Sequence, residues 1–196
     1  MSKAKTISIP FENVLLNLLA WFQKCSVPGI IIGGVALSLL GRPRVTKDID
    51  ALLFLDASNW DSFLKMGSKF GFAPRIKDVL DFAQKKRVLL MKHLPSDVPI
   101  DISFGALPFE EESVQRALKL KVKSFSLPFL TPEDFIIMKA VAHRTRDLAD
   151  IETVLDAYPK LDFKRIRKWV KEFAEALEMP EIYDDLNKLI KKKGTL

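Results

Sequence analysis

The first two thirds of the chain alternate between segments with the hydrophobic spacing of strands and segments with that of helices. Segments 29–33 and 49–55 are short, almost continuously apolar runs, which are typical of buried strands. Segments 10–25, 34–41 and 57–71 have apolar residues every three or four positions, which predicts helices, and the last two end at a glycine. Helices between strands favour an α/β (α+β) fold with a mixed sheet covered on at least one face.

Further short elements follow as far as residue 130. Apolar runs at 87–94 and 98–104 predict two strands joined by a tight turn. Helical turns are expected at 77–84 and 110–118. Another strand is expected within 118–130, where lysines alternate with apolar residues.

The pattern becomes entirely helical after residue 130. Thr131 precedes a proline and two acidic residues, and this order is typical of a helix start. The chain is therefore expected to divide into an α/β part, residues 1–130, and a helical C-terminal part, residues 131–196. The helices expected in the second part are 132–143, 147–157, 163–178 and 181–192.

Composition narrows the class of protein. Of 196 residues, 48% are hydrophobic and 29% charged, which is ordinary for a globular protein. The longest apolar run, 29–40, is shorter than the roughly 20 residues that span a bilayer, and the start lacks a secretory apolar region. With one cysteine and two histidines, an internal disulfide and a Cys/His zinc site are excluded. We therefore expect a cytoplasmic protein with no membrane partner.

The net charge of +6 adds one clue to the kind of partner. A basic surface suits a polyanion such as a nucleotide or RNA. A lysine-rich surface that serves only solubility is an equally good interpretation.

Acidic residues at two of the predicted strands carry the most specific chemistry. Asp48 and Asp50 lie two residues apart at the head of strand 49–55, so their side chains point to the same face. Asp101 lies among apolar residues in strand 98–104. If the two strands are neighbours, three carboxylates converge. Carboxylates are hard ligands for Mg²⁺ or Mn²⁺, and such a site supports phosphoryl transfer.

A glycine pair and a basic stretch complete the pattern. Gly33 and Gly34 stand between a strand and a helix, where backbone N–H groups can cradle a phosphate. The pair is part of neither a P-loop nor a dinucleotide motif. The polar residues that precede the acids, and that could hold phosphates or an acceptor, are Arg42, Arg44, Thr46 and Lys47. A lone glycine pair or Asp-x-Asp is common in loops, but the ordered combination is far more specific.

This combination resembles the polymerase-β-like minimal nucleotidyltransferases. Residues 33–53, GGVALSLLGRPRVTKDIDALL, are similar to the prokaryotic branch that includes nucleotidyltransferase toxins of abortive-infection and toxin–antitoxin systems. Residues 131–155, TPEDFIIMKAVAHRTRDLADIETVL, continue the resemblance with a lysine, an arginine and two aspartates in the order of that branch. The resemblance implies a polymerase-β-like core with a mixed sheet, followed by a helical C-terminal part.

The resemblance also implies roles for individual residues. Asp48, Asp50 and Asp101 would be catalytic and ligate the metal, and Gly33 and Gly34 would contact the triphosphate. Gly34 stands where many members of the superfamily have serine, so that only its backbone N–H is available there. The nucleotide-binding positions implied in the helical part are Lys139, Arg144, Asp147 and Asp150. Lys139 would reach a phosphate, and one of the two aspartates would orient basic residues or assist deprotonation of the acceptor.

The implied activity is metal-dependent transfer of a nucleoside monophosphate from an NTP to an acceptor hydroxyl. The acceptor is open between tRNA, protein and a small molecule, and a toxin of this kind would have a cognate antitoxin as partner. The alternative is a catalytically silent nucleotide- or RNA-binding module with the same fold. In the helical part, the alternative for Lys139 with Asp147, and for Arg144 with Asp150, is an ordinary salt bridge between helices.

Several aromatic residues are better explained as structural. Trp21, Trp60 and Trp169 lie at helical spacing among apolar residues and are expected in the core rather than as platforms for bases. His143 is one helical turn from Lys139 and is expected to be a structural histidine. His93, at the end of a predicted strand, is expected at the surface.

Overall fold

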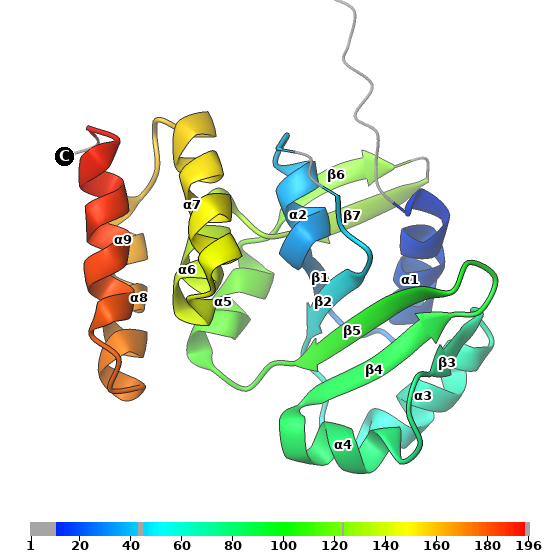
Figure 1. The fold of residues 1–196 in the computed structure, drawn as a ribbon. Helices are drawn as coiled ribbons and strands as arrows, with labels where there is room; N and C mark the ends of the chain where they lie inside the picture. Colours follow the sequence, from blue (N-terminus) through cyan, green and yellow to red (C-terminus); the bar gives the residue numbers. More distant parts are fainter. Residues whose placement is uncertain (1–10, 43–44, 123, 195–196) are drawn as a thin grey trace, which may run out of the picture. The chain divides into compact units, whose positions relative to one another are not determined.

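The computed structural model describes residues 11–42, 45–122 and 124–194. The chain divides into two compact units, residues 1–129 and 130–196, and each is described here by itself. The first unit contains a sheet with helices, and the second contains helices only within its described residues (Figure 1).

Seven strands of the first unit form one mixed sheet in the described residues, in the order β3-β4-β5-β2-β1-β7-β6. The strands are β1 (Gly29–Ile32), β2 (Ile49–Leu53), β3 (Phe72–Pro74), β4 (Val88–His93), β5 (Val98–Phe104), β6 (Leu118–Val122) and β7 (Phe125–Phe129). The pairs β2–β5 and β1–β7 are parallel, and the other pairs are antiparallel. The predicted class, an α/β fold with a mixed sheet, is confirmed.

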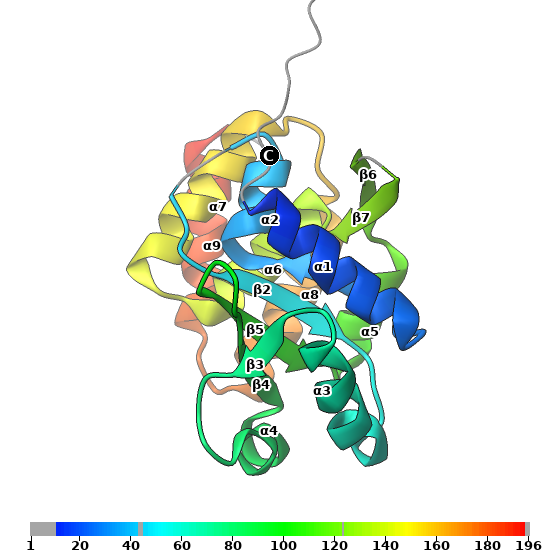
Figure 2. The same ribbon diagram turned by 90° about the vertical axis from the view of Figure 1, so that its right-hand side faces the viewer.

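The helices of this unit cover the sheet and link its strands. They are α1 (Glu12–Lys24), α2 (Gly33–Leu39), the short 3₁₀ turn η1 (Ala57–Asn59), α3 (Trp60–Ser68), α4 (Val79–Lys86) and α5 (Pro108–Gln115). In both views α3 and α4 lie at the end of the sheet that contains β3 and β4 (Figure 1, Figure 2). The segment 118–130, expected to hold one strand, forms the antiparallel pair β6 and β7.

An aromatic cluster fixes α1 and α3 on the sheet. The Trp21 ring stacks on Phe63 and Phe72, with centroids 4.3 and 5.3 Å away, and its indole N–H donates to the Phe63 carbonyl at 3.0 Å. Trp60 stacks on Phe104 at 4.1 Å. Because Trp21 and Trp60 are buried, their predicted place in the core is confirmed.

His93 corrects one of the sequence expectations. Its ring is buried rather than at the surface. One ring nitrogen lies 3.0 Å from the Asn17 amide nitrogen and the other 2.8 Å from the Ser96 hydroxyl. Two neutral polar partners satisfy the imidazole, and burial lowers its pKa below the ordinary value, so the neutral ring is favoured.

The second unit has four helices in its described residues, of which the first is buried on most sides and the other three are amphipathic. Its helices are α6 (Pro132–Ala142), α7 (Thr145–Ala157), α8 (Phe163–Ala176) and α9 (Glu181–Lys192). The Thr131 hydroxyl accepts from the backbone N–H of Asp134 at 3.1 Å, which is the helix cap that the sequence predicts. Trp169, expected in the core, is only half-buried on α8. None of the described helices combines the length and the hydropathy that a bilayer span requires.

Candidate active site

Two of the three predicted metal ligands are direct neighbours across the sheet. In the parallel pair β2–β5, Asp50 lies opposite Asp101. Partners in register point to the same face of a sheet. Both carboxylates are half-exposed, whereas the residues before and after each of them are buried. The sheet therefore presents two acids side by side on its more open face and apolar side chains on the other.

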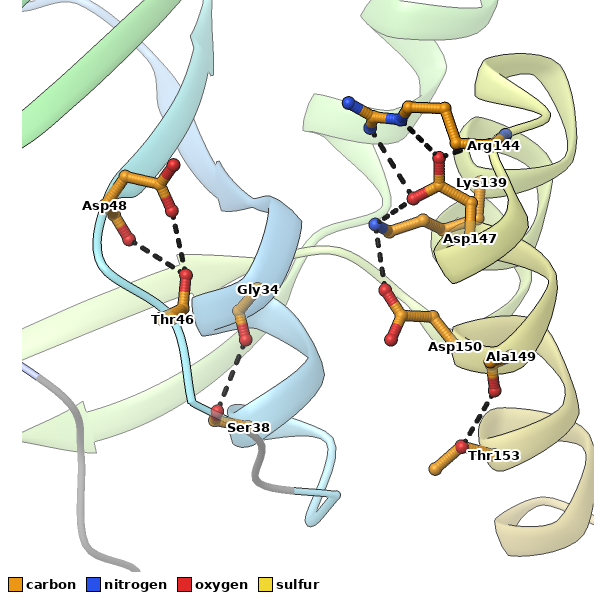
Figure 3. A network of polar contacts seen from close by, with 10 residues as sticks. All are labelled: Gly34, Ser38, Thr46, Asp48, Lys139, Arg144, Asp147, Ala149, Asp150 and Thr153. Atoms are coloured by element: carbon orange, nitrogen blue, oxygen red, sulfur yellow. Dashed lines mark hydrogen bonds and ion pairs between the residues drawn. The ribbon is translucent and has the colours of Figure 1, made fainter.

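Asp48 lies just before β2, on the same alternation as Asp50. The Thr46 hydroxyl donates to Asp48 Oδ1 at 2.8 Å, which fixes the carboxylate at the strand entrance (Figure 3). The negative charge of Asp48 acts on the titration of Asp101. The acids from two separate segments are therefore close enough to interact electrostatically.

Asp101 has a second neighbour that the sequence did not reveal. An N–H of the Arg75 guanidinium donates to Asp101 Oδ1. Burial raises the pKa of Asp101 above its ordinary value and the Asp48 charge acts in the same direction, while the Arg75 charge opposes both. Arg75 follows a three-residue strand in a polar segment, so nothing in the local pattern indicated contact with the acids.

The glycine turn lies directly against Asp50. Gly33 has a φ of +64°, and a Cβ placed there would lie 2.0 Å from Asp50 Oδ2. Only glycine can occupy this position without displacing the carboxylate. Gly34 is buried in α2, and its carbonyl accepts from the Ser38 hydroxyl at 3.2 Å. The structure thus places the predicted phosphate turn beside the acids.

The basic stretch before the acids is largely open to solvent. Lys47 and Arg42 are exposed. Arg44, another candidate of this stretch, lies outside the described residues. Thr46 is half-buried and engaged with Asp48, so its hydroxyl supports a carboxylate in this structure.

The candidate residues of the helical unit form a compact charged cluster. Lys139 Nζ lies 2.6 Å from Asp147 Oδ1 and 2.9 Å from Asp150 Oδ2, and all three side chains are buried (Figure 3). Arg144 Nε lies 2.6 Å from Asp147 Oδ2, and 58% of the Arg144 side chain is exposed. The salt bridge between Lys139 and Asp147, the alternative to a phosphate contact, is therefore present, and Lys139 also binds Asp150. The alternative pair of Arg144 with Asp150 has a different counterpart in the structure, because Arg144 pairs with Asp147.

The turn between α6 and α7 creates this cluster. His143 ends α6 in a left-handed conformation with a φ of 49°, and α7 begins two residues later at Thr145. Its ring Nε2 lies 3.2 Å from Asp185 Oδ2 on α9, consistent with the expected structural role. Burial disfavours the charged form of Asp147, but hydrogen bonds from Arg144 and Lys139 outweigh it and hold the pKa of that carboxyl below its ordinary value.

The chemistry of the acids fits a hard divalent cation. Asp48, Asp50 and Asp101 supply only carboxylate oxygens, which Mg²⁺ and Mn²⁺ prefer. Within residues 11–42, 45–122 and 124–194, no three acidic, histidine or cysteine side chains are already arranged as a metal-binding group. The contacts with Arg75 and Thr46 and the close approach to Gly33 hold the three carboxylates individually.

Solved structures share this fold at low sequence identity. An antigenic nucleotidyltransferase-like protein from Paracoccidioides brasiliensis is 15% identical, with 90% of this chain and 92% of that chain covered and a TM-score of 0.54. The antibiotic-resistance factor ANT(2'')-Ia is 15% identical over 87% of this chain and 94% of its own, with a TM-score of 0.58. The lincosamide antibiotic adenylyltransferase LnuA, solved with lincomycin, is 16% identical over 76% and 99%, with a TM-score of 0.53. These likenesses establish the fold.

The sequence itself assigns the family. No curated protein matches the chain. A family model described as the nucleotidyl transferase AbiEii toxin of type IV toxin–antitoxin systems matches residues 28–193, which span most of both units. The chain therefore belongs to the AbiEii family and is a nucleotidyltransferase with a polymerase-β-like fold.

Proposed function

We propose that the chain transfers a nucleoside monophosphate from an NTP to an acceptor hydroxyl, with Mg²⁺ or Mn²⁺ held by Asp48, Asp50 and Asp101. The observation that carries this proposal is the position of Asp50. Its carboxylate lies against the Gly33 turn on one side and is in register with Asp101 on the other. A glycine turn beside two neighbouring acids that could share a metal ion supports phosphoryl-transfer chemistry at this place.

Each acid contributes through its surroundings. A divalent cation bound by the carboxylates supplies positive charge that stabilises the triphosphate and lowers the pKa of the acceptor hydroxyl. Asp48 is fixed by Thr46. Asp101 is assigned a second role as acceptor of the hydroxyl proton, supported by a pKa that burial raises and by its half-exposed position.

The phosphates would lie along the glycine turn. Because Gly33 has no side chain, the Asp50 carboxylate lies directly against the turn, so a phosphate bound by the turn would lie close to a cation held by Asp50. Gly34 offers its backbone N–H. The exposed basic stretch with Lys47 and Arg42, together with Arg44, would attract the triphosphate from solvent.

The charged cluster of the helical unit would bind the nucleotide through its cations. Lys139 would exchange one of its two carboxylate partners, Asp147 or Asp150, for a phosphate oxygen, while the other keeps its ammonium in place. Arg144 supports this role because 58% of its side chain is exposed although its guanidinium is anchored on Asp147. Arg144 is thus suited to a second phosphate contact.

The proposal extends to acceptor and partner. A net charge of +6 supports a polyanionic acceptor such as tRNA. Protein hydroxyls and small-molecule hydroxyls are tested as acceptors in separate reactions. Membership of a toxin family supports a toxin role and a cognate antitoxin as partner. We propose that the reaction takes place in the cytoplasm.

The experiment follows the label through the reaction. The full chain is incubated with Mg²⁺ and each acceptor class, using NTPs labelled on either the α- or the γ-phosphate. We expect only the α-label in the acceptor, because pyrophosphate leaves with the γ-label. Asp50→Asn should lower the transfer rate by about 100-fold or more, because a bound metal ion stabilises the charge of the transition state by several kcal/mol.

A matched variant separates loss of chemistry from loss of fold. Asp61→Asn removes an exposed carboxylate that pairs with Lys65 on α3, and it should transfer at the wild-type rate. Both variants should unfold at temperatures close to that of the wild type. Equal transfer by Asp50→Asn and the wild type would refute the assigned site.

A further inference from the structure

Four residues form one row across the sheet at the level of the acids. Asp50 on β2 lies opposite Asp101 on β5, and Asp101 lies opposite Leu90 on β4. The backbone N–H of Arg75, directly after β3, donates to the Leu90 carbonyl at 3.0 Å. Since neighbours in register share a face, Arg75 continues this row one strand beyond Leu90.

The Arg75 side chain returns along this row to the acids. Its guanidinium passes the position of Leu90 and donates to Asp101 Oδ1. The two side chains are 29% and 36% exposed, compared with 75% and 56% in the surface pair of Lys65 and Asp61, so the contact is partly shielded from solvent. A partly desolvated, charge-assisted hydrogen bond of this kind holds a carboxylate more firmly than solvent does.

Arg75 and Asp50 lie on opposite sides of Asp101. The sheet order places β4 and β3 on one side of β5, and β2 on the other. Arg75 comes from the side of β3 and β4, whereas Asp50 lies on the side of β2. The guanidinium therefore leaves the side of Asp101 that faces Asp50 available to a ligand.

We propose that Arg75 is a positioning residue for the metal site: it anchors Asp101 from the side opposite Asp50 and holds the carboxylate ready to share a divalent cation with Asp50. This inference rests on the proposed function. Carboxylates that bind metals are commonly held by such partners, whose loss lowers metal affinity about 10- to 100-fold. The guanidinium also offsets one of the three negative charges that otherwise repel each other.

Two alternative roles of Arg75 predict different effects of its removal on metal affinity. A merely structural salt bridge predicts that removal of Arg75 leaves metal affinity unchanged. A guanidinium that competes with the cation for the carboxylate predicts tighter metal binding after removal. Metal affinity therefore distinguishes positioning from both rivals without reference to catalytic turnover.

The experiment measures Mn²⁺ binding to the full chain by titration calorimetry. Arg75→Ala should weaken binding about 10-fold or more. Arg75→Gln, which retains N–H donors, should recover part of the loss. Lys92→Ala is the matched control, because Lys92 lies on the same half-exposed face of β4 but pairs with Asp97 at 2.9 Å. It should bind Mn²⁺ as the wild type does.

One further variant separates failure of this inference from failure of the proposed function. Asp101→Asn should weaken Mn²⁺ binding if the metal site is correctly assigned. If Asp101→Asn weakens binding but Arg75→Ala leaves it unchanged or makes it tighter, the role of Arg75 is overturned and the metal site stands. If Asp101→Asn leaves binding unchanged, both assignments are overturned. Thermal unfolding of each variant verifies that the titrated protein is folded.

Discussion

At the scale of single residues, the site depends on one position that tolerates no side chain. Gly33 combines a left-handed backbone with close approach of the Asp50 carboxylate. The sequence marked the glycine pair as a phosphate turn, and the structure adds the reason why the first glycine is required. Because the same carboxylate is in register with Asp101, a disturbance at Gly33 reaches the acids through direct contact.

Gly33→Ala should therefore destabilise the fold more than the substitution of another glycine with a left-handed backbone. Gly41 provides the comparison, because its φ is +80° and a Cβ there would meet nothing within 4 Å. Both variants incur the strain of the left-handed backbone, about 1–2 kcal/mol. Overpacking against Asp50 should lower the unfolding free energy of Gly33→Ala by about 1–3 kcal/mol more.

Urea unfolding measures this difference, and the transfer assay measures its consequence for the site. Gly33→Ala should lose transfer because Asp50 is displaced, whereas Gly41→Ala should retain it. Equal unfolding free energies for the two variants would show that Asp50 does not press on the turn.

At the scale of elements, the local sequence pattern predicted most strands and helices, but it did not predict which strands pair with each other in the sheet. The apolar runs indicated β1, β2, β4 and β5, and helical spacing with caps indicated α6 to α9. The pairing of β2 with β5, which brings Asp50 beside Asp101, depends on packing between distant segments. The expectation that the acids converge was conditional on that pairing.

Strand β3 and the residue that follows it were not predicted from the local pattern, for physical reasons. Strand β3 has only three residues and includes Pro74, which lacks a backbone N–H. Its place at an edge of the sheet allows this, since an edge strand bonds on one side only. Arg75, which follows β3, was missed for the same reason. Arg75 contacts Asp101 from two strands away, and a contact between such distant segments leaves no periodic pattern in the sequence.

The cluster on α6 and α7 leads to a prediction about stability. Lys139→Met leaves Asp147 and Asp150 buried without their shared cation, which should lower the unfolding free energy by about 3–5 kcal/mol. Lys65→Met is the control, because Lys65 and Asp61 form an exposed pair within one helix worth about 0.5 kcal/mol. Urea unfolding measures the free energy of unfolding of both variants. Similar small decreases for the two would contradict the stabilising role assigned to Lys139.

At the scale of the whole molecule, the family model spans both compact units, so the AbiEii assignment belongs to the chain and not to the sheet alone. The site assignments rest on residues far apart in the sequence. Gly33, Asp50 and Asp101 come from three segments that the sheet unites. A direct test must therefore report on all three segments at once.

Cleavage of the backbone by bound iron provides that test. Fe²⁺ bound in place of Mg²⁺, with ascorbate and peroxide, generates radicals that cut the chain close to the ion, and mass spectrometry locates the cuts. We predict cuts in three separate segments, around residues 33–34, 48–50 and 101, which excess Mg²⁺ and the Asp50→Asn substitution both suppress. Cuts confined to other segments, or cuts that Mg²⁺ leaves unchanged, would contradict a shared metal site at these aspartates.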